Sequence, residues 1–187
     1  IAAGIPANKI VFSGVGKTRQ ELSEALQSGI LQINVESVSE LETLSQVALE
    51  LGVQAPVAFR VNPDVDAQTH VKISTGKAEN KFGIELERVH EVCKVALNAP
   101  GISLVGLAMH IGSQLTETGP FREAYTRMYE LVFNLRENGI NVERLDLGGG
   151  LGIPYGDTND PLIGPVEYAN MVSEVFADFD GKIIFEP

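Results

Sequence analysis

The chain has 187 residues, 44% of them hydrophobic, which suits one globular domain with a sizeable core. Its 14 basic and 25 acidic residues give a net charge of −11, which would repel nucleic-acid phosphates and anionic lipids, so we expect neither as a partner. With one cysteine, no run of roughly 18 or more apolar residues and no charged-then-apolar leader, the sequence is typical of a soluble cytoplasmic protein.

The chain opens with residues 1–6, which resemble the last turn of a helix closed by Gly4 and Pro6. Short β-rich apolar runs then alternate with longer segments of helical period. The expected strands are 10–12, 31–35, 57–61, 104–109, 144–147 and 183–185, and the expected helices are 17–28, 37–51, 85–98, 121–138 and 165–179. Because the chain starts inside one element and stops at another, we expect a fragment of a larger domain.

Two residue pairs predict where helices begin. Thr18 stands three residues before Glu21, and Ser37 stands three residues before Glu40. A hydroxyl followed at this spacing by a glutamate is the pattern of a capping box. Both positions agree with the helical period that follows them.

Continuous apolar strands joined by helices indicate a parallel sheet buried on both faces, which leaves a doubly wound sheet or a βα barrel. Polar residues favour the barrel because they gather directly after the strands, and the carboxyl ends of barrel strands meet at one mouth. These residues are Ser13, Gly14, Glu36, residues 60–62, residues 110–113, residues 148–150 and Glu186. We therefore expect one α/β domain over residues 1–187, a partial barrel whose strand ends face one pocket.

The strongest local signal is the segment 145–152, Leu-Asp-Leu-Gly-Gly-Gly-Leu-Gly, which follows an expected strand. Consecutive glycines let backbone amides approach an anion closely, and phosphate is the usual occupant of such a nest. A tight turn that needs positive φ is the simpler alternative, but three adjacent glycines exceed its needs. The segment matches neither a Walker loop nor the dinucleotide fingerprint.

Single polar residues also stand where apolar strands end. His110 begins His-Ile-Gly-Ser-Gln, where a buried imidazole needs either a structural partner or a ligand. Arg60 and Glu186 would be costly to bury alone, and an ion pair between them would satisfy both without any function. We expect His90 at the surface and Cys93 in the core, and no metal, because the histidines lack metal-ligand spacing.

Several short motifs together resemble the diaminopimelate decarboxylase family. They are Thr75-Gly76, Lys81-Phe82-Gly83, residues 110–114, Asp146 with residues 148–150, residues 153–155 and Glu186-Pro187, and the resemblance covers essentially the whole chain. Members are fold-type III pyridoxal-phosphate (PLP) enzymes, with an alanine-racemase-like (β/α)8 barrel followed by a β-rich domain. The resemblance implies that this chain holds about six of the eight βα units, the third to the eighth strands. The first two strands and the β-rich domain would be absent.

The resemblance also implies roles toward PLP. The implied contacts are His110, Ser113, Gly148, Gly149, Gly150, Glu186 and Arg60. His110 would stack on the pyridine ring, and Ser113 and the glycine amides would contact the phosphate or its surroundings. Glu186 would pair with the pyridine nitrogen, and Arg60 would belong to the hydrogen-bond network under the ring. A carboxylate at Glu186 favours a decarboxylase over alanine racemase, where the matching strand offers an arginine.

The implied function is PLP-dependent decarboxylation of meso-2,6-diaminopimelate to L-lysine by a homodimer, with the long polar segment 72–84 as part of the contact. No lysine matches the position that binds the cofactor covalently, Cys93 does not match the family's cysteine segment, and the expected Gly-Arg after Glu186-Pro187 is missing. We therefore expect this chain alone to bind PLP weakly at best and to catalyse nothing. Three alternatives are an ornithine, arginine or carboxynorspermidine decarboxylase, a non-catalytic PLP-binding or regulatory homologue, and a phosphate-binding barrel without PLP.

Overall fold

The computed structural model describes residues 1–65, 82–154 and 162–186. The elements in chain order are a 3-10 helix Ala7–Lys9, β1 Val11–Phe12, α1 Arg19–Ser28, β2 Gln32–Val35, α2 Val38–Leu51, β3 Ala55–Asn62, β4 Ile84–Glu85, α3 Leu86–Asn98, β5 Ile102–Met109, α4 Thr118–Glu137, β6 Arg144–Asp146, α5 Pro165–Val175 and β7 Lys182–Ile184. The expected strands and helices are confirmed, with ends displaced by a few residues. The two-residue strand β4 was not predicted.

The start of the chain differs from its prediction. Residues 1–4 form one turn, in which the amide of Gly4 donates to the carbonyl of Ile1 at 2.9 Å and Gly4 has φ +81°. Pro6 then precedes the 3-10 helix instead of following a helix. The prediction of a closing helical turn was wrong because glycine and proline also punctuate simple turns.

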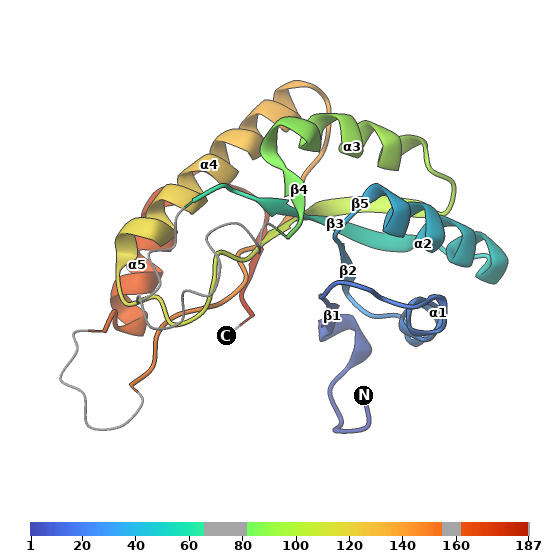
Figure 1. The fold of residues 1–187 in the computed structure, drawn as a ribbon, viewed down its shortest axis with the longest axis horizontal. Helices are drawn as coiled ribbons and strands as arrows, with labels where there is room; N and C mark the ends of the chain where they lie inside the picture. The colour runs from blue at the N-terminus through green and yellow to red at the C-terminus, as the bar shows by residue number, and fades with distance from the viewer. Residues whose placement is uncertain (66–81, 155–161, 187) are drawn as a thin grey trace.

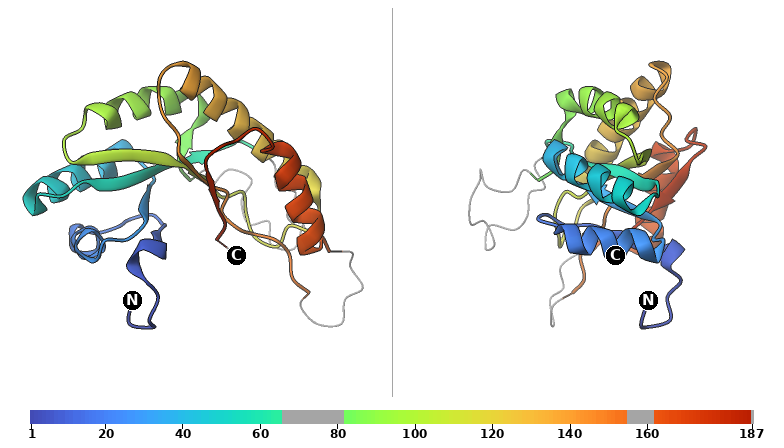
Figure 2. Two further views of the ribbon diagram at one scale, coloured as in Figure 1. Left: turned by 180° about the vertical axis from the view of Figure 1, so that it is seen from behind. Right: turned by 90° about the vertical axis from the view of Figure 1, so that its right-hand side faces the viewer.

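All strand pairs are parallel, and the sheet order is β1-β2-β3-β5-β6-β7, with β4 paired to β3 alone. A doubly wound sheet reverses its strand order at a switch point, whereas here the order follows the chain. Figures 1 and 2 show the helices following one another around the outer side of a curved sheet. The structure is therefore a half-barrel, which confirms the barrel prediction.

The sheet is buried on both faces over much of its length, as a barrel wall requires. All four residues of β2 are buried, and Phe59 of β3 and Leu107 of β5 are fully buried. A cluster of aromatic rings, Phe121, Tyr125, Tyr168 and Phe176, joins α4 to α5. This packing fixes the helices behind β5, β6 and β7, the strands that carry the candidate site.

Helix starts show how local chemistry sets these boundaries. The capping box of Thr18 and Glu21 is confirmed, with both reciprocal hydrogen bonds present. Ser37 caps α2 by accepting from the amide of Glu40 at 3.2 Å, but the second half of that box was predicted wrongly. The Glu40 carboxylate accepts from the amide of Glu36 and from Lys17 instead, so it does not return to the backbone of Ser37.

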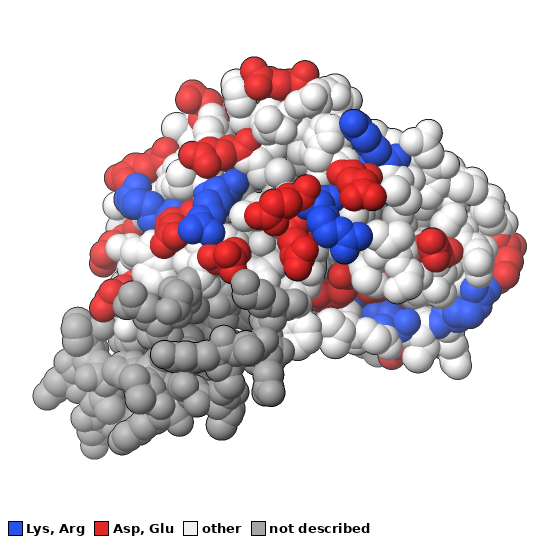
Figure 3. All heavy atoms as spheres, turned by 45° about the horizontal axis from the view of Figure 1, so that its top comes forward, with Lys and Arg blue, Asp and Glu red and all other residues white. Residues whose placement is uncertain are grey.

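The outer helical surface in Figure 3 carries acidic side chains interspersed with basic ones. Exposed ion pairs join Arg122 to Glu174 and Arg127 to Glu123. Such pairs contribute at most about 1 kcal/mol each, so they do not decide the fold. Among the described residues, no helix is long and apolar enough to cross a membrane.

Candidate functional site

Three of the predicted site groups meet at neighbouring strand ends. His110 follows β5, the glycine segment follows β6 and Glu186 follows β7, and these strands are adjacent in the sheet. The amide of Glu186 donates to the carbonyl of Gly148 at 2.8 Å. A Cβ added at Gly148 would overlap the Met109 carbonyl and lie 3.1 Å from Nδ1 of His110. The structure therefore brings the histidine, the glycines and the glutamate together.

A second set of contacts ties the loop after β5 to the loop after β6. The amide of Leu115 donates to the carbonyl of Gly150 at 2.9 Å. The Gln114 side chain both donates to the carbonyl of Ile153 at 3.2 Å and accepts from its amide at 2.8 Å. Ser113 lies exposed on this loop, between Gly112 and Gln114, and its predicted contact with a phosphate stays a prediction.

The glycine segment has the geometry of an anion cradle. Gly148 and Gly150 adopt φ of +65° and +104°, values that L side chains rarely reach. The Gly148 amide donates to Asp146 Oδ1 at 3.0 Å. Within the described residues, the amides of Gly149 and Gly150 have no hydrogen-bond partner. Two successive free donors in a strand-to-loop turn fit a phosphate, so this segment suits the phosphate end of PLP.

His110 suits contact with an aromatic ring. The pKa of its imidazole is lowered, mainly by burial and then by the Arg60 charge, while the Glu186 charge opposes the shift. The ring is therefore neutral at neutral pH. Its side chain makes no hydrogen bond to another described residue, which leaves it free to pack against a ligand.

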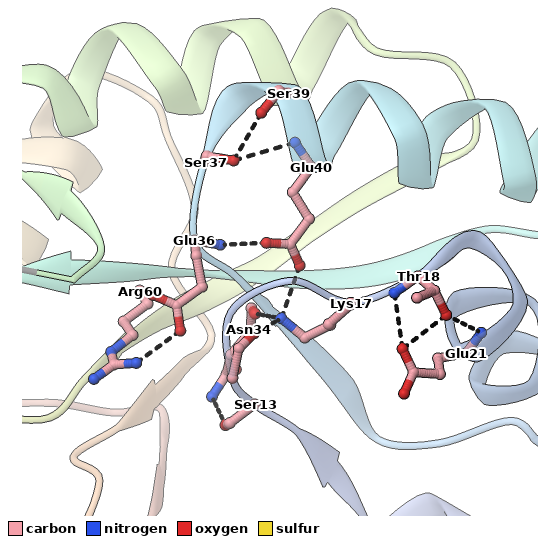
Figure 4. Close-up of polar contacts among 11 residues, drawn as sticks. Ser13, Lys17, Thr18, Glu21, Asn34, Glu36, Ser37, Ser39, Glu40 and Arg60 are labelled. Carbon is pink, nitrogen blue, oxygen red and sulfur yellow. Dashed lines mark hydrogen bonds and ion pairs between the residues drawn. The ribbon is translucent and has the colours of Figure 1, made fainter.

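Arg60 and Glu186 do not pair with one another, so an ion pair between them, the alternative to a functional role, does not account for either charge. Nη1 of Arg60 donates to Glu36 Oε1 at 2.7 Å, and this pair is largely buried. Glu36 directly follows β2 and Arg60 lies on the adjacent strand β3, so the two reach one another directly, as Figure 4 shows. The Arg60 guanidinium also lies 5.5 Å from the ring centre of Phe82. Arg60 remains close enough to His110 and Asp146 to act on the pKa of each.

A hydrogen-bond network that was not predicted lies inside the sheet beneath these groups. Nδ2 of Asn34 donates to Asp146 Oδ2 and to Ser13 Oγ, each at 2.8 Å. Ser13 donates to Glu186 Oε1 at 2.7 Å, and Nε2 of Gln32 donates to Asn34 Oδ1 at 3.0 Å. Figure 4 shows Asn34 directed toward Ser13. The sequence carried one signal for this network. Gln32 and Asn34 are amide side chains two residues apart in an apolar strand, so both point to the same face of the sheet.

Asp146 is a buried acid of this network whose pKa is raised. It is fully buried, and burial raises the pKa of its carboxyl group to about 6. The Glu186 charge adds to this increase, whereas the hydrogen bonds from Asn34 and from the Gly148 amide oppose it. A buried carboxylate that depends on two donors is sensitive to the loss of either one.

A hollow of about 480 Å³ lies beside the candidate site, lined by Val15, Gly16, Lys17, Glu36, Ser37, Ser39, Glu40, Thr43, Phe82 and Gly83. None of the predicted PLP contacts lines it, although Glu36 links it to Arg60. Lys17 is buried at its wall and donates to Glu40, to the carbonyl of Gly14 and to that of Asn34 (Figure 4). All three protons of this ammonium are engaged, so Lys17 acts as a structural link between β1, β2 and α2.

Other predicted positions lie outside the site. Cys93 is buried in α3, as expected, and burial raises the pKa of its thiol to about 12, which makes it unreactive. His90 was expected at the surface but is half-buried, with Nε2 enclosed and without a partner among described residues. No group of three or more metal-binding side chains occurs in the described ranges. His70 and nearly all of segment 72–84 lie outside them.

Comparisons with known proteins identify the family of the chain. The model of a family described as "Pyridoxal-dependent decarboxylase, pyridoxal binding domain" matches residues 1–187. Diaminopimelate decarboxylase from Haemophilus influenzae is 50% identical over 188 residues, which cover 100% of this chain and 45% of that protein. The chain thus spans about half the length of the curated relatives it matches.

Solved structures of decarboxylases also align with the chain. Diaminopimelate decarboxylase from Helicobacter pylori, complexed with L-lysine, aligns with a TM-score of 0.91 and 39% identity, over 100% of this chain and 47% of that one. Lysine/ornithine decarboxylase from Vibrio vulnificus, complexed with putrescine, aligns with a TM-score of 0.77 and 20% identity, over 100% and 46%. The second likeness shows a shared fold alone.

Proposed function

The chain belongs to the pyridoxal-dependent decarboxylase family, and we propose that the protein converts meso-2,6-diaminopimelate to L-lysine with release of carbon dioxide. The observation that carries the proposal is the contact among His110, Gly148 and Glu186 at three adjacent strand ends. His110, the glycine segment that begins at Gly148, and Glu186 would hold three parts of PLP: the ring face, the phosphate and the ring nitrogen.

The chain's own residues divide the work of binding between them. Gly149 and Gly150 would donate their free amides to the phosphate, with Ser113 beside them. His110, neutral because burial lowers the pKa of its imidazole, would pack on the ring face without adding a charge. Arg60, held by Glu36, would orient the groups under the ring.

Glu186 would control the chemistry. PLP, when bound, supplies an electron sink for the pair of electrons left as carbon dioxide departs. The Glu186 carboxylate would hold a proton on the ring nitrogen and keep that sink effective. Ser13 already donates to Glu186 Oε1, and no described residue donates to Oε2. Oε2 is therefore available to accept a hydrogen bond from the protonated ring nitrogen.

The choice of substrate is supported by similarity. The chain is 50% identical to the Haemophilus diaminopimelate decarboxylase but 20% identical to the Vibrio lysine/ornithine decarboxylase. The full-length enzyme assayed on diaminopimelate, ornithine, arginine and carboxynorspermidine should release carbon dioxide fastest from the first. A higher kcat/KM on any of the others would replace this substrate assignment.

Glu186→Gln in the full-length protein tests the electron-sink assignment, because glutamine keeps the size and an acceptor for Ser13 but loses the charge. We expect kcat for lysine formation to fall on the order of 100-fold while PLP remains bound, since an electrostatic contact to the reacting centre is lost. Glu117→Gln, an exposed change in the loop after β5, is the matched control and should leave kcat unaltered. Unchanged turnover in Glu186→Gln would contradict the proposal.

We also propose that the protein is a homodimer and that it resides in the cytoplasm. The resemblance to the family supports the dimer. The single cysteine, which is buried and free, supports a reducing compartment.

A further inference from the structure

Asn34 lies at the centre of the polar network and is linked through one intermediate residue to each end of the proposed cofactor site. Asn34 is 2% exposed as a residue, and its backbone carbonyl accepts from Lys17 Nζ at 2.7 Å. Toward the ring end it reaches Glu186 through Ser13, and toward the phosphate end it reaches the Gly148 amide through Asp146.

The direction of every hydrogen bond in this network follows from donor and acceptor chemistry. The Asn34 amide must face Asp146 with its NH2 group, because an ionised carboxylate can only accept. The carbonyl Oδ1 then faces Gln32, which donates to it. The two protons of Nδ2 go to Asp146 and to Ser13, so both are used.

Ser13 consequently has one remaining role. Its oxygen accepts from Asn34, so its own proton is directed at Glu186 Oε1, which lies 2.7 Å away. This bond occupies Oε1 and leaves Oε2 as the oxygen that can serve the ring nitrogen. Glu186 follows the last described strand, so a contact from β1 and β2 fixes a side chain that its own strand end would leave free to rotate.

On the phosphate side, Asp146 is an intermediate between Asn34 and the glycines. Asp146 Oδ2 accepts from Asn34 and Oδ1 accepts from the amide of Gly148 at 3.0 Å. Because Gly148 has positive φ and also binds Glu186 through its carbonyl, a displaced Asp146 would shift the free amides that follow it.

We infer that Asn34 is a positioning residue that couples the two ends of the cofactor site, orienting Glu186 through Ser13 and the phosphate-binding glycines through Asp146. The inference rests on the proposed function, because it assumes that PLP occupies these groups. Asn34 touches neither end itself. Its removal leaves a buried carboxylate without one of its donors and a serine free to turn away from Glu186.

The test uses the full-length protein with Asn34→Ala, Asn34→Asp, Ser13→Ala and Ser13→Thr, with the surface change Asn141→Ala as control. The measurements are the equilibrium dissociation constant of PLP from the apoenzyme, the absorption spectrum of bound PLP, kcat for decarboxylation, and the apoenzyme melting temperature. If Asn34 had only a structural role, its substitution would lower the melting temperature. The folded fraction of the variant would then bind PLP and turn over substrate as the wild type does.

We expect both Asn34 variants to weaken PLP binding about tenfold or more and to lower kcat, because loss of a donor to a buried acceptor acts on both ends. Ser13→Ala should lower kcat and shift the spectrum with PLP affinity nearly intact, since it affects only the ring end. Ser13→Thr keeps the hydroxyl and should restore kcat. Asn141→Ala should match the wild type in all four measurements.

An Asn34 variant that binds PLP as tightly as the wild type, with the wild-type spectrum and kcat, would overturn the coupling while leaving the proposed function intact. A wild-type protein that binds no PLP would overturn both. If the Asn34 variants do not fold, Ser13→Ala decides: an unchanged spectrum and kcat there would refute the relay to Glu186.

Discussion

Asp146 makes folding depend on pH in a direction set by its burial. Its pKa is raised from an ordinary value of 3.8 to about 6, so the folded state binds this proton more tightly than the unfolded state. The folded state is therefore stabilised by the protonated carboxyl below about pH 4, and this stabilisation is lost as the pH rises through 6. A pKa shift of this size corresponds to about 3 kcal/mol in the free energy of unfolding. We expect Asp146→Asn to remove this slope from the free energy of unfolding between pH 4 and 7.

Denaturant unfolding of the full-length protein at several pH values measures that slope. Asp178→Asn is the matched control, because it removes the same charge from an exposed position and should retain the wild-type slope. Equal slopes for Asp146→Asn and the wild type would mean that Asp146 titrates normally.

Single residues also mark the limit of what the sequence predicts about the site. His110, Glu186 and the glycines were identified because each follows an apolar strand, and strand order then placed them together. The pairing of Arg60 with Glu36 was not predicted, because it depends on which strand ends are adjacent in space. Asn34 was missed because it lies within a strand, where the spacing of Gln32 and Asn34 shows that they share a face but not which distant side chains they meet.

At the scale of elements, the contact between β5 and β6 depends on Gly106. A Cβ there would overlap the Arg144 carbonyl, next to a register shift between β3 and β5. We expect Gly106→Ala to lower the free energy of unfolding by about 1–3 kcal/mol, because overpacking forces the strands apart. Gly119 in α4 has open space around it, so Gly119→Ala should be neutral or stabilising by about 1 kcal/mol. Thermal unfolding compares the two, and equal effects would contradict this packing.

The helices and strands were predictable because each is a local pattern: an apolar run, a helical period or a glycine stop. Strand β4 was not, because a two-residue strand exists only through its pairing with β3. The half-formed capping box at Ser37 has a similar cause, since Lys17 attracts Glu40 from a distant part of the chain.

At the scale of the whole molecule, the order of strands and the curvature of the sheet follow from the repeated βα pattern. For the proposed homodimer, light scattering of the full-length protein should give twice the protomer mass at micromolar concentration. A protomer mass combined with full decarboxylase activity would rule out an essential dimer.

A crystal structure of the full-length holoenzyme will show whether the ends of β5, β6 and β7 surround one PLP molecule. We predict the phosphate on the amides of Gly149 and Gly150, the ring against His110 and the ring nitrogen at Glu186. Cofactor density in the separate hollow beside Lys17, or away from the three strand ends, would refute this location of the cofactor.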